Sequence, residues 1–170
     1  MYSHIKNLQP IASWRIWSAV GLVLSFSILR GINMPIDWVY VHWLMNYDYG
    51  FIKRGLVGSV VKALGFYNNP AIARTFIDIF SMIIYGLLLL SFILVGYRIL
   101  SLTRHKAPAV MTVILFFSSG FLVMTGNLIG YFDHLWQIVT ILCLMLIFKR
   151  QMLLAAVIQI PLILIHESYL

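Results

Sequence analysis

Residues 75–100 read TFIDIFSMIIYGLLLLSFILVGYRIL and form the longest apolar run in the chain. The run holds one acid near its start, Asp78, and one base near its end, Arg98. A helix needs about 20 apolar residues to cross the hydrocarbon core of a bilayer, so this run is long enough to cross with a tilt. We therefore expect an integral membrane protein built from α-helices.

The composition of the whole chain supports this class. Of its 170 residues 62% are hydrophobic and 10% are charged, whereas about a quarter are charged in a soluble domain. The net charge of +7 is spread between apolar runs, so it forms no basic face and nucleic acid is not an expected partner. The single cysteine, Cys143, lies inside an apolar run, which gives no basis for a disulfide framework or a cysteine metal site.

Five apolar segments predict an all-α, polytopic transmembrane helical bundle of about five spans in a single domain, residues 1–170. The segments are residues 12–29, 75–100, 109–124, 135–148 and 152–165. The last two are shorter than about 20 residues, so they need flanking residues or a thinner bilayer.

The distribution of Lys and Arg predicts an orientation. With a cytoplasmic N-terminus, seven basic residues and no acid fall on the inside: Lys6, Arg15, Arg98, Arg104, Lys106, Lys149 and Arg150. This agrees with the positive-inside rule and predicts a multi-pass protein of a bacterial-type inner (plasma) membrane. Residues 30–74, 126–134 and 166–170 then lie outside.

The outer loop, residues 30–74, is the only long polar interval in the chain. Residues 51–64 show helical spacing of apolar positions, which predicts a short amphipathic helix in the membrane interface. Pro35 and Asp37 are suited to begin an earlier helix over residues 36–45. Gly65 is expected to end the amphipathic helix, and residues 68–70 to form a turn.

Four of the five acids fall on the outer side with three histidines. They are Asp37, Asp48, Asp133, Glu167, His42, His134 and His166. Ionisable groups near a membrane core are costly and tend to be paired or functional. The ordinary alternative is that loops hold polar residues in any case.

Asp48 precedes the expected amphipathic helix, and Lys53 and Arg54 lie in its first turn. Cations there oppose the helix dipole, and an anionic ligand such as a lipid phosphate explains them. The alternative is unspecific anchoring to head groups.

Two further pairs are candidates. Asp133 and His134 could take a proton from a hydroxyl nucleophile, although Asp133 could also be a helix N-cap. His166 and Glu167 do not make a zinc signature, because the second histidine of HExxH is missing. Asp78 lies four residues after Arg74, and we expect a local ion pair.

The first span, the acid-containing outer loop and its interfacial helices resemble the N-terminal part of the C-superfamily of membrane glycosyltransferases and polysaccharide polymerases. The resemblance covers about residues 12–80. It implies use of a polyprenyl-phosphate-linked sugar, with Asp48 or Asp37 as the outer-loop acid and Lys53 and Arg54 on the phosphate. The chain departs from the family in having fewer spans and no acidic doublet. It also ends soon after residue 165, which suggests a truncated member or a subunit that needs a partner.

The resulting hypothesis is an outer-face site for a lipid-linked phosphosugar, of the glycosyltransferase or polysaccharide-polymerase type. Its catalytic residues are Asp48, Asp133 and His134, and its substrate-binding residues are Lys53, Arg54, Asp37, His166 and Glu167. No metal site or particular cofactor is indicated. The expected partners are membrane lipids and the lipid-linked sugar. The alternative is a non-catalytic accessory subunit, bound to a partner membrane subunit, or a remnant of a larger protein.

Overall fold

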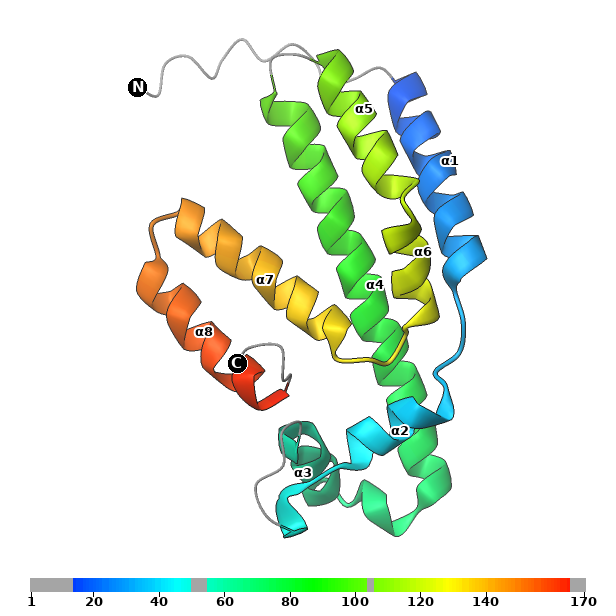
Figure 1. Ribbon diagram of the computed structural model, residues 1–170, viewed down its shortest axis with the longest axis vertical. Coiled ribbons are helices and arrows are strands. Elements are labelled where there is room, and N and C mark those ends of the chain that lie inside the picture. Colours follow the sequence, from blue (N-terminus) through cyan, green and yellow to red (C-terminus); the bar gives the residue numbers. More distant parts are fainter. Residues whose placement is uncertain (1–13, 50–54, 104–105, 166–170) are drawn as a thin grey trace. The chain divides into compact units, whose positions relative to one another are not determined.

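A computed structural model describes residues 14–49, 55–103 and 106–165, and these residues contain helices and no strand (Figure 1). The predicted all-α class is therefore confirmed. The elements are α1 (Trp14–Gly31), α2 (Asp37–Leu44), η2 (Tyr47–Tyr49), α3 (Gly55–Ala63), η3 (Phe66–Asn68), α4 (Pro70–Leu102), α5 (Lys106–Phe117), α6 (Gly120–Asn127), α7 (Asp133–Phe148) and α8 (Met152–Ile165).

Within the described residues each of the five predicted spans is largely helical, but only two helical segments there are long and apolar enough to cross a membrane. These are Pro70–Leu102 and Ala107–Asn127, with mean hydropathies of 2.5 and 2.0. The other apolar helices, Ile16–Gly31, Asp133–Phe148 and Met152–Pro161, are shorter. The structure thus supports two possible crossings by length and composition, and a bundle of five is not established.

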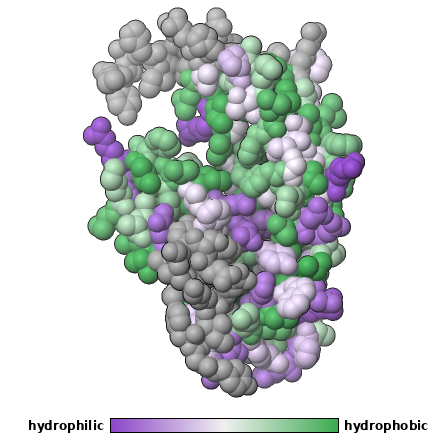
Figure 2. Space-filling model, viewed as in Figure 1, coloured by the Kyte–Doolittle hydropathy of each residue, from purple (hydrophilic) through white to green (hydrophobic). Residues whose placement is uncertain are grey.

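Apolar side chains are also abundant on the outside of the molecule, as the green areas of Figure 2 show. On α4 the exposed fractions of Ile79, Ile83, Leu87 and Leu90 are 57%, 51%, 51% and 50%. They recur every three or four residues and so share one face of the helix. A continuous exposed apolar face of this kind is suited to contact lipid or another protein.

The chain divides into two compact units. Among the described residues, the first unit comprises α1, the end of α4 from Phe92, α5 and α6. The second comprises α2, α3, α4 up to Ser91, α7 and α8.

In the first unit α1 packs against α5 and α6. The backbones of α1 and α6 touch: a Cβ placed at Gly126 would lie 2.5 Å from the carbonyl carbon of Gly31. Small residues allow this close approach, as they do between membrane helices.

The predicted third span is broken, because α5 ends at Phe117 and α6 begins at Gly120. Three serine hydroxyls accompany the break by donating to the last carbonyls of α5. Ser118 Oγ donates to Leu115 O (3.2 Å), Ser119 Oγ to Phe116 O (2.6 Å) and Ser27 Oγ of α1 to Phe117 O (2.6 Å). The carbonyls of a helix end need such partners where water is scarce.

In the second unit, the helices and turns predicted for residues 30–74 are largely confirmed. The helix predicted over residues 36–45 is α2, and α3 lies within the predicted 51–64, whose first residues fall outside the described part. Gly65 has φ +79°, the left-handed conformation of a helix-ending glycine. Asn69 Oδ1 accepts from the amides of Ala71 (3.1 Å) and Ile72 (3.3 Å). Because Asn69 caps the helix and Pro70 is its first residue, α4 begins five residues before the predicted 75.

The core of the second unit joins α2, α3, α4 and the residue before α7. Its buried members are Val39, Trp43, Val61, Ile77, Ile84 and Phe132. The indole Nε1 of Trp43 donates to the carbonyl of Gly130 at 2.8 Å. Gly130 has φ +95° and lies against Val39. The loop before α7 is thus fixed onto α2.

Candidate functional site

An open pocket of about 230 Å³ lies between α2 and the first two turns of α4, inside the second unit. Its lining is contributed by both helices: Asp37, Tyr40, Leu44, Pro70, Ala73, Arg74 and Ile77. On each helix these residues are spaced by one, three or four, so they lie on one face. The pocket therefore follows from the packing of α2 on α4.

Arg74 is the cation of this pocket. Its guanidinium carbon lies 4.6 Å from the ring centroid of Tyr40, and its Nη2 is 3.6 Å from Asp37 Oδ1. The side chains of Arg74 and Asp37 are 62% and 94% exposed. An ion pair this exposed is weak because water screens it, so a ligand can take either partner at little cost.

Tyr40 connects the two residues that the sequence predicts to form an ion pair. Its hydroxyl donates to Asp78 Oδ1 at 2.5 Å, while its ring faces Arg74. The predicted local ion pair is therefore replaced by an arrangement in which Tyr40 lies between the charges. Burial, and then the hydrogen bond to Asp78, raise the pKa of Tyr40 above its ordinary value of 10.0, against an opposing effect of Arg74. At neutral pH Tyr40 is thus a neutral donor.

This set of groups suits a ligand that carries both phosphate and hydroxyl groups. The planar guanidinium of Arg74 can bind a phosphate through two parallel hydrogen bonds. The exposed carboxylate of Asp37 can accept a proton or a hydrogen bond from a hydroxyl.

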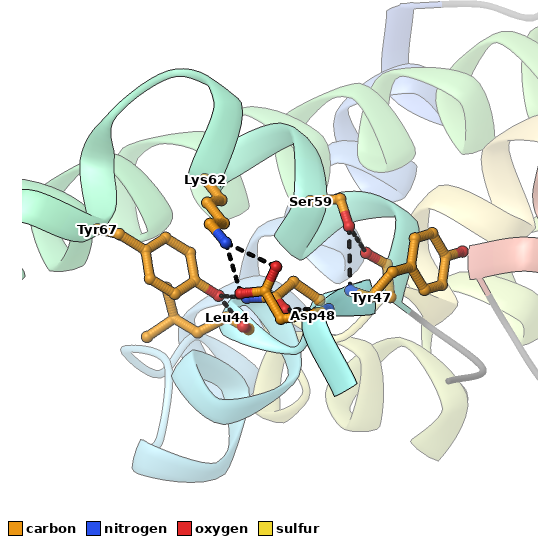
Figure 3. A network of polar contacts seen from close by, with 8 residues as sticks. Leu44, Tyr47, Asp48, Ser59, Lys62 and Tyr67 are labelled. Atoms are coloured by element: carbon orange, nitrogen blue, oxygen red, sulfur yellow. Dashed lines mark hydrogen bonds and ion pairs between the residues drawn. The ribbon is translucent and has the colours of Figure 1, made fainter. Parts of the chain in front are cut away.

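Asp48 does not line this pocket, and its carboxylate forms an ion pair with Lys62 (Figure 3). Lys62 Nζ of α3 lies 2.6 and 2.5 Å from its two carboxylate oxygens. The amide of Asp48 donates to Asn46 Oδ1 at 2.8 Å. Nearby, Tyr67 OH donates to Leu44 O. These contacts tie the α2–α3 connection to α3, and they occupy the carboxylate that the sequence predicts to act as a base.

Asp133 and His134 occupy the start of α7. Asp133 is the first residue of the helix, and the N-cap position is Phe132, so the simple N-cap alternative for Asp133 does not hold. The His134 side chain is 1% exposed, and its ring centroid lies 5.6 Å from that of Tyr85. His134 is therefore a residue of the interior of the unit.

The structure brings one predicted substrate-binding residue, Asp37, into a pocket. Lys53, Arg54, His166 and Glu167 lie outside the described residues, so their predicted roles stay predictions. The same holds for the catalytic roles of Asp48, Asp133 and His134, which nothing in the geometry tests. Within the described residues no group of three His, Cys, Asp or Glu side chains could hold a metal ion.

Sequence reasoning missed Tyr40, Arg74 and Asp78 as site residues. Their spacing does indicate that Asp37 and Tyr40 share one face of α2, and that Arg74 and Asp78 share one face of α4. The contact between the helices joins residues 38 positions apart, and no local pattern predicts that.

No family model matches this chain, and no curated protein and no solved structure shows significant similarity to it.

Proposed function

We propose that this is a multi-pass membrane protein that binds a lipid-linked phosphosugar in the pocket between α2 and α4, as a glycosyltransferase or polysaccharide polymerase would. The observation that carries the proposal is the exposed Arg74 guanidinium, held over Tyr40 beside the exposed carboxylate of Asp37. Phosphate and sugar hydroxyls are the chemistry that this set can recognise.

The length of α4 supports a place for the pocket at the membrane interface. The helix has 33 residues, which is about 50 Å at 1.5 Å per residue, and a hydrocarbon core is about 30 Å thick. Arg74 lies in the second turn of α4, so it falls in the excess length at one end. The exposed apolar face of Ile79, Ile83, Leu87 and Leu90 continues along the same helix and offers a surface for a polyprenyl chain.

The proposed topology has five crossings with the N-terminus in the cytoplasm, which puts the pocket on the outer side. It is supported by the apolar character of all five predicted segments and by the positive-inside rule. In this arrangement Arg74 binds the leaving phosphate, together with Lys53 and Arg54. Asp37 binds the sugar, and Asp48, or Asp133 with His134, activates the acceptor hydroxyl.

Binding of polyprenyl phosphate to the purified protein in lipid nanodiscs tests the proposal. We expect Arg74→Ala to weaken binding at least about tenfold, in line with the loss of a charge-assisted pair of hydrogen bonds. Arg98→Ala, at the other end of α4, is the matched control and should bind as the parent protein does. Equal binding by Arg74→Ala would refute the proposal. Equal binding of phosphatidylglycerol would reduce the site to unspecific head-group anchoring.

A non-catalytic accessory subunit is the second candidate, and the pairing of Asp48 with Lys62 favours it, because a carboxylate used in this way is a structural group. Asp37→Asn separates the two functions. An enzyme loses turnover of labelled polyprenyl phosphosugar at unchanged protein levels. An accessory protein shows no turnover from the start, and it co-purifies with a partner subunit.

A further inference from the structure

A stripe of polar residues runs inward along α4 from the pocket. Arg74, Asp78, Ser81 and Tyr85 follow one another at intervals of four, three and four, so they share one face of the helix. The stripe covers about 16 Å at 1.5 Å per residue. It begins with an exposed arginine and ends with Ser81 and Tyr85, which are 1% and 3% exposed.

Ser81 differs from the other hydroxyl residues on this helix. Thr75 and Ser91 donate to carbonyls four residues before them, at 3.0 and 2.8 Å, which is the usual way to satisfy a hydroxyl in an apolar helix. The buried hydroxyl of Ser81 has no hydrogen-bond partner among the described residues, and neither has that of Tyr85. A buried polar atom without a hydrogen-bond partner destabilises the folded protein. This indicates that Ser81 and Tyr85 have a role other than helix packing.

A second polar stripe approaches from α7 and meets the first. Gln137 Oε1 and Thr140 Oγ1 are also buried without a partner in the described part of the chain. They follow His134 at intervals of three residues, and the His134 ring lies against that of Tyr85. The two stripes thus come together at the Tyr85–His134 contact.

The unpartnered groups on the two stripes are three hydroxyls and one amide oxygen. They carry no net charge; the hydroxyls can donate and accept, and the amide oxygen accepts. Water is the ligand that fits them, because a buried water makes two to four hydrogen bonds and needs little space. A metal ion does not fit, because no cluster of metal-ligating side chains exists in the described residues.

We propose that Ser81, Tyr85, Gln137 and Thr140 form a buried hydrated site, which continues the pocket inward along α4. This inference does not depend on what the pocket binds. It assigns the polar stripe of α4 to water.

Silver-ion accessibility tests the hydration. Silver is about the size of a water molecule and reacts with a thiolate, which forms readily only where the thiol is hydrated. In a Cys143→Ser background we compare Ser81→Cys with Leu88→Cys, because Ser81 and Leu88 are fully buried on the same helix, at 1% and 0% exposure. The thiols that escape silver are counted with a fluorescent maleimide after denaturation.

We expect silver to block Ser81→Cys at least about tenfold faster than Leu88→Cys. Equal rates overturn the proposal. If circular dichroism shows that Leu88→Cys is poorly folded, Val61→Cys replaces it, since Val61 is 2% exposed and lies in the core of the second unit, away from the pocket lining.

Tyr85→Phe gives an independent readout. A hydroxyl that only lacks a partner destabilises the protein, so its removal should raise the unfolding midpoint. A hydroxyl that binds water loses that bond, so the midpoint should fall, and the silver reaction at Ser81→Cys should slow. A raised midpoint with an unchanged silver rate contradicts the hydrated site.

Discussion

Substitution of Gly130 by alanine should destabilise the second unit strongly, for two separable reasons. Gly130 has φ +95°, and a residue with a Cβ pays about 1–2 kcal/mol for a left-handed conformation. The new Cβ would also lie 2.5 Å from Val39 Cγ1, 3.1 Å from Ser81 Oγ and 3.3 Å from Val39 Cγ2. Because Val39 is 0% exposed, it has no room to move away. Overpacking of this kind costs about 1–3 kcal/mol. The expected loss in the free energy of unfolding is the sum, about 2–5 kcal/mol.

Gly65→Ala is the matched control, because it isolates the backbone cost. Gly65 has φ +79°, and nothing lies within 4 Å of a Cβ placed there, so we expect a loss of only about 1–2 kcal/mol. Both variants are measured by denaturant titration in detergent micelles, with helix content followed by circular dichroism.

The double variant Gly130→Ala with Val39→Ala tests the overlap directly. Val39→Ala removes the two methyl groups, among them the nearest atom at 2.5 Å, and leaves only Ser81 Oγ at 3.1 Å from the new Cβ. The two substitutions should therefore be less damaging together than the sum of their separate effects, by about 1–3 kcal/mol. The reasoning fails if Gly130→Ala costs no more than Gly65→Ala, or if the two substitutions are additive.

Three further outcomes are expected. Trp43→Phe leaves the Gly130 carbonyl without its 2.8 Å donor and should cost about 1–3 kcal/mol in the same titration. The hydrogen bond from Tyr40 to Asp78 should stabilise the protein fully below Tyr40's ordinary pKa of 10.0, and this stabilisation should be lost as the pH rises through the raised pKa of Tyr40 in the folded state. In a pH series of unfolding titrations, Tyr40→Phe should abolish this loss of stability at alkaline pH. Lys62→Ala breaks an ion pair whose side chains are 47% and 44% exposed, so it should cost no more than about 1 kcal/mol, and less in high salt.

The local features of the fold could be predicted because the residues that cause them are adjacent in sequence. Asn69 and Pro70 are a cap and a first helical residue in any context, and Gly65 has the freedom that a helix end requires. The apolar segments predict helices for the same reason, since the period of their side chains is local.

The features that could not be predicted depend on partners far away in the chain. Residues 109–124 read as one continuous helix, yet the helix breaks after Phe117, where a hydroxyl 90 positions earlier, that of Ser27, supplies a donor. Asp48 has Lys53 and Arg54 close by in sequence, but its partner in the structure is Lys62, 14 positions away. The pocket itself needs α2 to lie on α4, which the periodicity of either helix does not specify.

The break between α5 and α6 also has a mechanical consequence. Bending an intact helix in lipid means breaking hydrogen bonds that nothing there replaces, whereas at Phe117 the ladder is already open and the carbonyl is bonded to Ser27. If the first unit lies in a bilayer, as proposed above, curvature or tension in that bilayer should be absorbed at this joint, and α1 should move with it through the Ser27 bond and through its contacts with α6. Distances between spin labels on α5 and α6, measured in bilayers of increasing thickness, should change in the parent protein. The first unit should therefore bend at this joint, while its helices stay straight elsewhere.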